Sequence, residues 1–130
     1  MIVVDASVVV DLLLRGPDAD ALASRLLDQG EDLHAPHLLD VEVAQVFRRF
    51  ALQGMLSDQR GGEALRLLAA FPLTRHDHTS LLARIWALRP NLTAYDAAYV
   101  SLAELLGATL LTRDRRLGAA SGHRAMVEVM

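Results

Sequence analysis

The chain has 130 residues, a net charge of −3, no cysteine, and 13 basic residues that are all arginine. The absence of lysine excludes Schiff-base enzymes, which need a lysine amine, and P-loop nucleotidases, which need the lysine of the phosphate loop. The absence of cysteine excludes disulfides, thiolate metal sites and cysteine nucleophiles. A hydrophobic content of 52% with 22% charge indicates a globular protein, and the length predicts a single domain over residues 1–130.

The N-terminal segment MIVVDASVVVDLLLR has an acid at position 5 and lacks the basic stretch that begins a signal peptide. Every uncharged stretch of the chain is much shorter than the roughly 20 residues that a membrane-spanning helix needs. We therefore expect a cytoplasmic protein that does not contact a membrane.

Short apolar runs alternate with longer helical patterns from the N-terminus onward, which is typical of a parallel sheet built from strand–helix units. Proline and glycine mark the ends of the helices. In the first half of the chain we expect a strand at 2–4, helices at 8–14 and 18–30, a strand at 32–35, a helix from 36 to about 54, and a helix from 57 onward, with Leu67 on its buried side.

In the second half we expect an edge strand at 72–75, a helix at 78–88, a helix capped by Thr93 and ended by Gly107, a strand at 108–112, a short helix after Asp114, and a strand at 126–129. On the helix at 78–88, Leu82 and Trp86 are expected to face the core. The whole pattern predicts an α/β protein: a three-layer α/β/α sandwich with a four- or five-stranded, mostly parallel sheet. In such sheets the functional crevice lies at the carboxyl ends of the strands.

Two acidic residues directly follow predicted strands. Asp5 comes after Ile2-Val3-Val4, and Asp114 lies one residue beyond the strand that ends at Thr112. If these strands are adjacent and parallel, both carboxylates lie at the same edge of the sheet. An alternative role for each is to cap the helix that follows, because aspartate is a preferred N-cap residue.

Two further acids lie on helical faces that should turn inward. Asp96 belongs to a possible capping box that begins at Thr93, yet its neighbours one turn away are apolar. Glu42 lies in the second turn of an apolar helix, with Leu38 and Val46 on the same face. A carboxylate on a buried stripe needs a partner.

These four carboxylates repel one another if they converge at one edge of the sheet. At about 5 Å and an effective dielectric constant of about 20, each like-charge pair costs roughly 3 kcal/mol. Such a cluster must hold protons or bind cations, and oxygen-only ligands favour Mg²⁺ or Mn²⁺. Ions of this kind over carboxylates suit the hydrolysis of phosphodiester bonds.

Several blocks of the sequence together resemble the PIN domain, and more closely the VapC ribonuclease toxins of bacterial toxin–antitoxin pairs. These blocks are VVDASVVVDLL at the start, an acid in the helix after Pro36, the segment TAYDAAYVSLAELLGATLLTRDRRL, and the short apolar end of the chain. The resemblance covers essentially the whole chain. It implies an α/β/α sandwich, a Mg²⁺-dependent endoribonuclease activity, a homodimer, and a small antitoxin whose tail blocks the active site.

The resemblance also assigns roles to individual residues. The family's four acids match Asp5, Glu42, Asp96 and Asp114, which would be both catalytic residues and metal ligands. The small hydroxyl residues near the first and last acids match Ser7 and Thr112 and would support them. Some family members have a further acid shortly after the fourth one, where this chain has Arg115, Arg116 and Leu117.

RNA would then bind through arginine. Without the four proposed ligands, the net charge of the chain changes from −3 to +1. Arg113, Arg115 and Arg116 surround Asp114 and are the main candidates for binding RNA phosphates. The alternative is that they are ordinary solvated surface groups.

Two other interpretations compete with the nuclease. His34 with His37, or His76 with His78, could be proposed as a zinc site, although neither pair has the i, i+4 spacing of a helical site, and exposed histidines are the simpler explanation. The protein could also be a non-catalytic, PIN-like or receiver-like binding module in which the four acids serve capping and packing. The lack of lysine and the presence of Ala6 after Asp5 argue against a receiver.

Overall fold

The structure is a computed structural model that describes residues 1–27 and 30–130. Five strands form one sheet: β1 (Ile2–Val4), β2 (Leu33–Pro36), β3 (Thr74–His76), β4 (Thr109–Thr112) and β5 (Met126–Val129). The helices are α1 (Ala6–Leu13), α2 (Ala19–Leu27), α3 (Leu38–Leu52), α4 (Asp58–Ala69), the 3₁₀ turn η1 (Thr79–Leu81), α5 (Leu82–Ala87), α6 (Ala94–Leu106) and α7 (Arg115–Ala119).

All five strands are parallel, in the order β3-β2-β1-β4-β5, which confirms the predicted parallel α/β sheet. The central strand β1 consists of three buried β-branched residues and pairs with β2 on one side and β4 on the other. In the register of β1 and β4, Val4 lies opposite Leu111. The carboxyl ends of β1 and β4 therefore reach the same edge of the sheet together.

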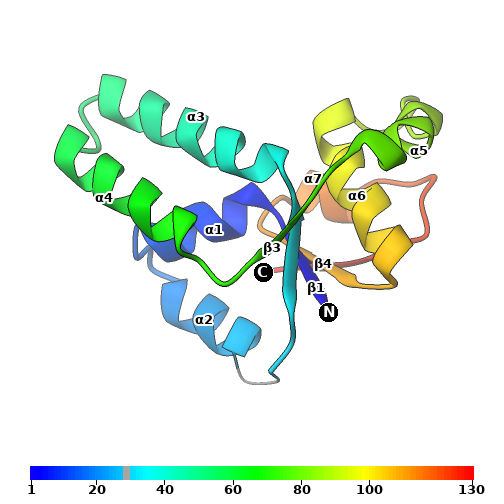
Figure 1. Cartoon of the computed structure of the whole chain (residues 1–130), viewed down its shortest axis with the longest axis horizontal. Helices are drawn as coiled ribbons and strands as arrows, with labels where there is room; N and C mark the ends of the chain where they lie inside the picture. The colour runs from blue at the N-terminus through cyan, green and yellow to red at the C-terminus, as the bar shows by residue number, and fades with distance from the viewer. Residues whose placement is uncertain (28–29) are drawn as a thin grey trace.

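Helices cover both faces of the sheet, as expected for three layers (Figure 1). Helices α1, α2, α3 and α4 pack together on one face, while α6 covers the other face, lying against β1, β2 and β4, and α5 packs on α6. The core between the layers is built from the buried strand residues and from helix residues such as Leu22, Leu39, Tyr99 and Leu102. The carboxyl edge of the sheet lies between these two groups of helices.

The predicted punctuation of α6 is confirmed in detail. Thr93 is the N-cap, and its side-chain oxygen accepts a hydrogen bond from the backbone N–H of Asp96. Gly107 ends the helix in the left-handed conformation with φ of 62°, which is why glycine occupies that position. The expected edge strand near Pro72 is also present, as β3, and begins at Thr74 after the proline.

Three apolar residues that were expected to face the core are instead exposed: Leu67 (59%), Leu82 (57%) and Trp86 (69%). The segment at 78–88 is not one helix but a 3₁₀ turn followed by the short α5, and this break changes which side chains turn inward. Leu81 and Leu88 are buried there. On α4 the buried stripe runs through Gly61, Ala64 and Leu68, so Leu67 lies one position away from it.

The longest helix in the described ranges is α3, with 15 residues that include two acids and two arginines. None of the helices that the structure describes combines the length and the hydropathy required to cross a membrane.

Candidate active site

Two of the four predicted acids meet where β1 and β4 end. Asp5 follows the last residue of β1 directly, and its backbone N–H donates a 3.0 Å hydrogen bond to the carbonyl of Leu111 on β4. Asp114 follows Thr112, the last residue of β4, after one intervening residue. Because the two strands pair in parallel, residues that are more than 100 positions apart in sequence lie side by side at this edge.

The carboxylate of Asp5 is held by three hydrogen bonds. Its Oδ1 accepts from the backbone N–H of Ala6 at 2.8 Å, which caps α1. Its Oδ2 accepts from the hydroxyl of Ser7 at 2.8 Å and from the hydroxyl of Thr112 at 2.7 Å. The side chain is therefore fixed in one orientation and is only 8% exposed.

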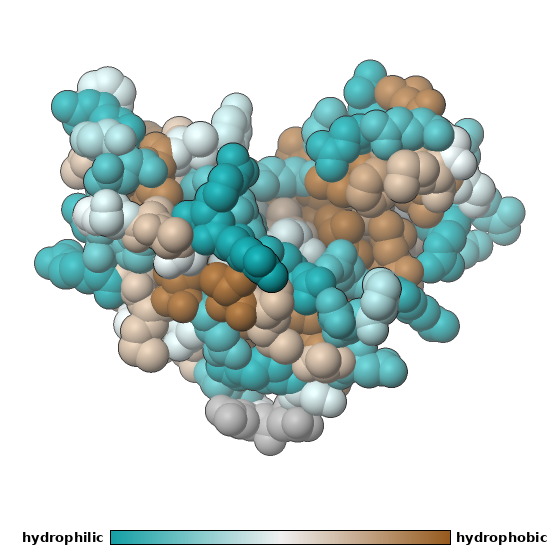
Figure 2. Space-filling model, turned by 180° about the vertical axis from the view of Figure 1, so that it is seen from behind, coloured by the Kyte–Doolittle hydropathy of each residue, from teal (hydrophilic) through white to brown (hydrophobic). Residues whose placement is uncertain are grey.

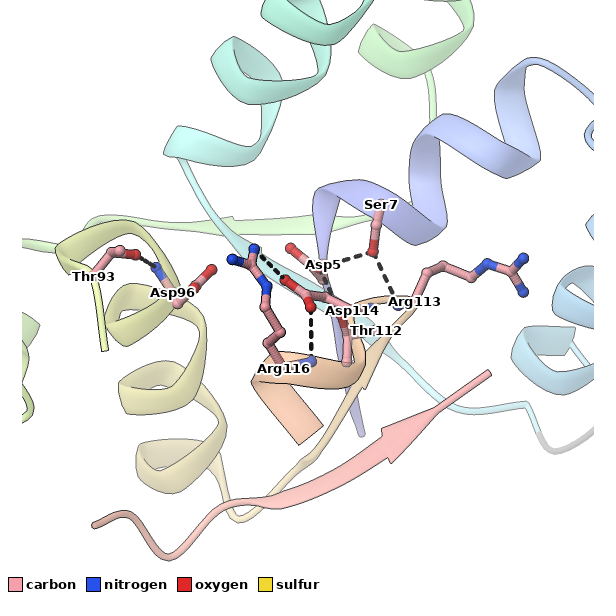
Figure 3. Close-up of polar contacts among 8 residues, drawn as sticks. All are labelled: Asp5, Ser7, Thr93, Asp96, Thr112, Arg113, Asp114 and Arg116. Carbon is pink, nitrogen blue, oxygen red and sulfur yellow. Dashed lines mark hydrogen bonds and ion pairs between the residues drawn. The ribbon is translucent and has the colours of Figure 1, made fainter. Parts of the chain in front are cut away.

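The hydroxyls of Ser7 and Thr112 link the acids to one another (Figure 3). Besides donating to Asp5, the Ser7 hydroxyl accepts from the backbone N–H of Arg113 at 3.0 Å, and the Thr112 hydroxyl accepts from the backbone N–H of Asp114 at 3.0 Å. Each hydroxyl thus uses one donor and one acceptor position to join the end of β1 to the segment after β4.

Asp96 lies in the first turn of α6 with its carboxylate half-buried, and its helical neighbours Leu92, Tyr99 and Val100 are buried, as the pattern predicted. The capping box is formed on one side only: the Thr93 hydroxyl oxygen accepts from the backbone N–H of Asp96, but no described hydrogen bond runs from the backbone N–H of Thr93 to the carboxylate of Asp96. Burial raises the pKa of Asp96, and the charges of Asp5 and Asp114 raise it further.

Glu42, on α3, has the largest pKa shift of the four acids. Burial, and then the charges of Asp5 and Asp96, raise the pKa of Glu42 to about 7. Its Oε1 is buried and has no hydrogen-bond partner. The nearby Tyr99 hydroxyl acts to lower the pKa of Glu42, but by less than the other causes raise it. This hydroxyl is also buried without a hydrogen-bond partner. The mutual charge effects show that α3, α6 and the end of β1 bring their acids into one cluster.

Asp114 differs from Glu42 and Asp96 because its pKa is lowered and not raised. Partial burial acts to raise its pKa, but the backbone N–H and the guanidinium of Arg116 outweigh burial and hold the pKa of Asp114 below its usual range. Its Oδ1 accepts from that N–H at 2.9 Å and so caps α7, as the alternative interpretation proposed. Capping and a place in the acidic cluster are therefore compatible for Asp5 and Asp114.

An open groove of about 810 Å³ lies beside the cluster. Figure 2 shows the surface hollowed between the lobe of α3 and α4 and the lobe of α5 and α6. The groove is lined by His37, Leu38, Val41, Glu42, Gln45, Val46, His78, Thr93, Tyr95, Asp96 and Arg116. Two of the predicted acids thus form part of its wall, next to apolar side chains that include Leu38 and Val46, which share the helical face of Glu42.

The three arginines around Asp114 do not behave alike. The side chain of Arg116 is 92% exposed and lines the groove, and Arg115 is exposed. Arg113 instead ion-pairs with Asp11 at 2.8 Å and with Asp18 at 2.7 Å. Figure 3 shows its guanidinium directed away from Asp96 and from the groove side of the cluster.

The histidines do not form the zinc site that was considered. His34 on β2 and His76 on β3 bond to each other, with Nδ1 and Nε2 2.8 Å apart, and both are partly buried rather than exposed. His37 and His78 are exposed. In the described ranges, no group of three or more His, Asp or Glu side chains is arranged, as it stands, to hold a metal ion.

The four acids nevertheless fit a hard divalent cation by their chemistry. They supply only carboxylate oxygens, which are the preferred ligands of Mg²⁺ and Mn²⁺. The charge of Asp5 raises the pKa values of both Glu42 and Asp96, and the buried Oε1 of Glu42 lacks a donor, so a cation at this cluster would relieve both the repulsion and the unpaired oxygen.

Comparison with known proteins agrees with this architecture. The model of the PIN domain family matches residues 2–122, which is nearly the whole chain. The chain therefore belongs to the PIN domain family, as the sequence motifs predicted.

Its relatives define the group within that family. Ribonuclease VapC9 of Mycobacterium tuberculosis is 44% identical over 117 residues, which cover 90% of this chain and 88% of VapC9. Ribonuclease VapC12 of the same species is 39% identical over 130 residues, covering 100% of this chain and 99% of VapC12. The chain is thus a member of the VapC group.

Solved structures support the fold at lower sequence identity. The crystal structure of VapBC2 from Rickettsia felis, bound to a DNA fragment from their promoter, aligns with a TM-score of 0.71 at 14% identity over 99% of this chain and 98% of that chain. A toxin–antitoxin complex from Klebsiella pneumoniae aligns with a TM-score of 0.65 at 20% identity over 92% and 91%. These alignments support the five-stranded PIN-like sandwich.

Proposed function

We propose that this protein is a Mg²⁺-dependent endoribonuclease that acts as the toxin of a toxin–antitoxin pair. The observation that carries the proposal is Glu42, a half-buried carboxyl whose Oε1 has no partner and whose pKa is raised to about 7 by burial and by Asp5 and Asp96. A cation would supply the partner that this carboxyl oxygen lacks. The relatives of the chain, such as VapC9 and VapC12, are named ribonucleases.

Asp5, Glu42, Asp96 and Asp114 are the residues that would hold the ion. A bound Mg²⁺, or Mn²⁺ in its place, supplies a water of lowered pKa and stabilises negative charge on phosphate oxygens. The residues of the chain prepare the site for that chemistry. Three hydrogen bonds hold the Asp5 carboxylate in place, and Ser7 and Thr112 keep the segment around Asp114 beside it.

RNA would approach along the groove, whose wall includes Glu42 and Asp96. Arg116 lines this groove and is almost fully exposed, so its guanidinium is free to bind a phosphate in addition to its 3.4 Å contact with Asp114. Arg115 is the second exposed arginine at the same end of the sheet. Together they would reduce the electrostatic repulsion between the acidic cluster and the RNA phosphates.

The proposal extends to partners and location. An antitoxin is the expected protein partner, since one of the similar structures is a toxin–antitoxin complex. We also propose a homodimer in the cytoplasm, on the basis of the family match. The oligomeric state can be measured by light scattering, and co-purification with the product of the adjacent gene tests the antitoxin.

The decisive experiment is RNA cleavage by carboxylate-to-amide variants. We expect Asp5→Asn and Asp96→Asn to reduce cleavage of total RNA in Mg²⁺ by at least a hundredfold while the circular dichroism spectrum stays that of the parent. Asp58→Asn, at an exposed carboxylate of the first turn of α4, is the matched control and should cleave normally. Full activity in both variants would overturn the nuclease and favour the non-catalytic binding module.

A further inference from the structure

Arg113 makes an unusual set of contacts for a residue next to a proposed metal ligand. Its Nε lies 2.8 Å from Oδ2 of Asp11, and one of its terminal nitrogens lies 2.7 Å from Oδ2 of Asp18. Its backbone N–H donates a 3.0 Å hydrogen bond to the hydroxyl of Ser7. One residue therefore ties the segment after β4 to α1 and to the connection between α1 and α2.

Two of these contacts lie on a single face of α1. Ser7 and Asp11 are four residues apart in the helix, so they lie one above the other. Arg113 contacts the first through its main chain and the second through its side chain. This two-point attachment fixes the distance and the angle between α1, whose N-cap is Asp5, and the peptide that leads to Asp114.

We propose that Arg113 is a positioning residue for the cation site, which holds the carboxylates of Asp5 and Asp114 in register through Ser7. This inference rests on the proposed function, because it concerns the same acids. It replaces the initial expectation that Arg113 binds RNA, since both of its charged contacts are to carboxylates of this chain and its side chain is directed away from the groove.

The contrast with Arg116 supports this division of roles. The side chain of Arg113 is 25% exposed, against 92% for Arg116. A phosphate that bound Arg113 would have to displace Asp11 and Asp18, whereas Arg116 needs no such exchange. The partners of Arg113 are themselves partly exposed, so its ion pairs add little to global stability, and the main effect of losing them is on local geometry.

The experiment compares Arg113→Ala with Arg84→Ala, which removes a two-bond ion pair with Glu104 at a distance from the acids. Replacing a residue that orients metal ligands typically lowers metal affinity by about 10–100-fold. In thermal melts titrated with Mn²⁺, the concentration for half-maximal stabilisation should rise at least tenfold in Arg113→Ala and less than twofold in Arg84→Ala. With RNA, kcat should fall while KM stays within about twofold of the parent.

A second variant distinguishes a positioning role of Arg113 from a phosphate-binding role, because each role predicts a change in a different quantity. The double variant Asp11→Asn/Asp18→Asn neutralises both partners, so it removes the ion pairs of Arg113 but retains the arginine itself. If Arg113 is a positioning residue, this double variant raises the Mn²⁺ midpoint as Arg113→Ala does. If Arg113 binds phosphate, the double variant lowers KM for RNA instead. If Arg113→Lys partly recovers the Mn²⁺ midpoint of the parent, the positive charge that pairs with Asp11 and Asp18 is what holds the segment in position.

Each result has one meaning. An unchanged Mn²⁺ midpoint in both Arg113→Ala and the double variant, or a rise in KM with kcat unchanged, overturns the positioning role and leaves the nuclease proposal intact. A parent protein that binds Mn²⁺ but cleaves no RNA overturns the nuclease, and the midpoints still decide the role of Arg113. A parent that shows no stabilisation by Mn²⁺ overturns the positioning role, and RNA cleavage by that parent is then measured separately.

Discussion

The hydroxyl of Thr112 donates a buried 2.7 Å hydrogen bond to Oδ2 of Asp5, a residue 107 positions away in the sequence. The same hydroxyl accepts the backbone N–H of Asp114 at 3.0 Å. One side chain at the end of β4 therefore holds the carboxylate of Asp5 and the backbone of Asp114, the acids that follow two neighbouring strands. Since Thr112 is fully buried, no water can take over either hydrogen bond.

Replacing Thr112 should therefore damage the site more than its small size suggests. Thr112→Val keeps the shape but leaves Asp5 with one fewer donor and the N–H of Asp114 without an acceptor. We expect about 1–3 kcal/mol lower free energy of unfolding and about 10–100-fold lower cleavage activity, measured by urea denaturation and RNA cleavage. Thr112→Ser retains the hydroxyl and should recover most of the activity. Equal activity in the valine and serine variants would contradict this role.

Glu42 predicts a pH-dependent instability of the cation-free protein. Its pKa is about 7 in the folded state, against an ordinary glutamate value of 4.5. Between these values the folded state binds more protons than the unfolded state, so the free energy of unfolding falls as pH rises through this window. The penalty is fully present above pH 7 and absent below about pH 4.5.

Glu42→Gln removes this penalty. Relative to the parent, the variant should gain stability between pH 5 and pH 8, by about 1–2 kcal/mol after allowance for solvent screening of a half-buried group. Urea denaturation in the presence of a chelator at both pH values measures the difference. Glu63→Gln, at an exposed position of α4, is the control and should show no such gain. If the free energies of unfolding of Glu42→Gln and the parent differ by the same amount at both pH values, the pKa of Glu42 is not raised in the folded state.

The same shift predicts that cation binding weakens in mild acid. An ion binds the carboxylate form, so a proton on Glu42 competes with it below about pH 7. Titration calorimetry with Mn²⁺ at pH 6 and pH 8 should show severalfold weaker binding at the lower pH. In Glu42→Gln this pH dependence should be reduced. Equal affinity of the parent at both pH values would remove Glu42 from the ligand set.

Arg115 and Arg116 should control how salt affects RNA binding. Each lost phosphate contact lowers the slope of log affinity against log salt concentration by about 1. In an inactive Asp96→Asn background, Arg115→Ala/Arg116→Ala should weaken RNA binding and reduce this slope by up to about 2, as followed by fluorescence anisotropy. Arg66→Ala, at an exposed arginine of α4, should leave the slope unchanged. An unchanged slope in the double variant would place the RNA elsewhere.

Local patterns in the sequence correctly predicted most of the fold. The buried run before Asp5, the cap at Thr93 and the glycine at position 107 are each decided by neighbouring residues, because burial, capping and backbone conformation are local requirements. The same patterns failed for Leu82 and Trp86, where a 3₁₀ turn changed the phase of the helix. Hydrophobic spacing cannot report such a break, since it assumes one continuous helix.

The sequence by itself determined which acids lie at the carboxyl edge of the sheet, because strand ends and helix faces follow from hydrophobic periodicity and the family motifs mark the same positions. Only the tertiary structure decided how those acids are held. The hydrogen bond from Thr112 to Asp5 and the ion pairs of Arg113 with Asp11 and Asp18 join segments about 100 residues apart. Arg113 and Arg116 look equivalent beside Asp114 in the sequence. Their surroundings differ because the fold brings the carboxylates of Asp11 and Asp18 to the guanidinium of Arg113 and leaves that of Arg116 in an open groove.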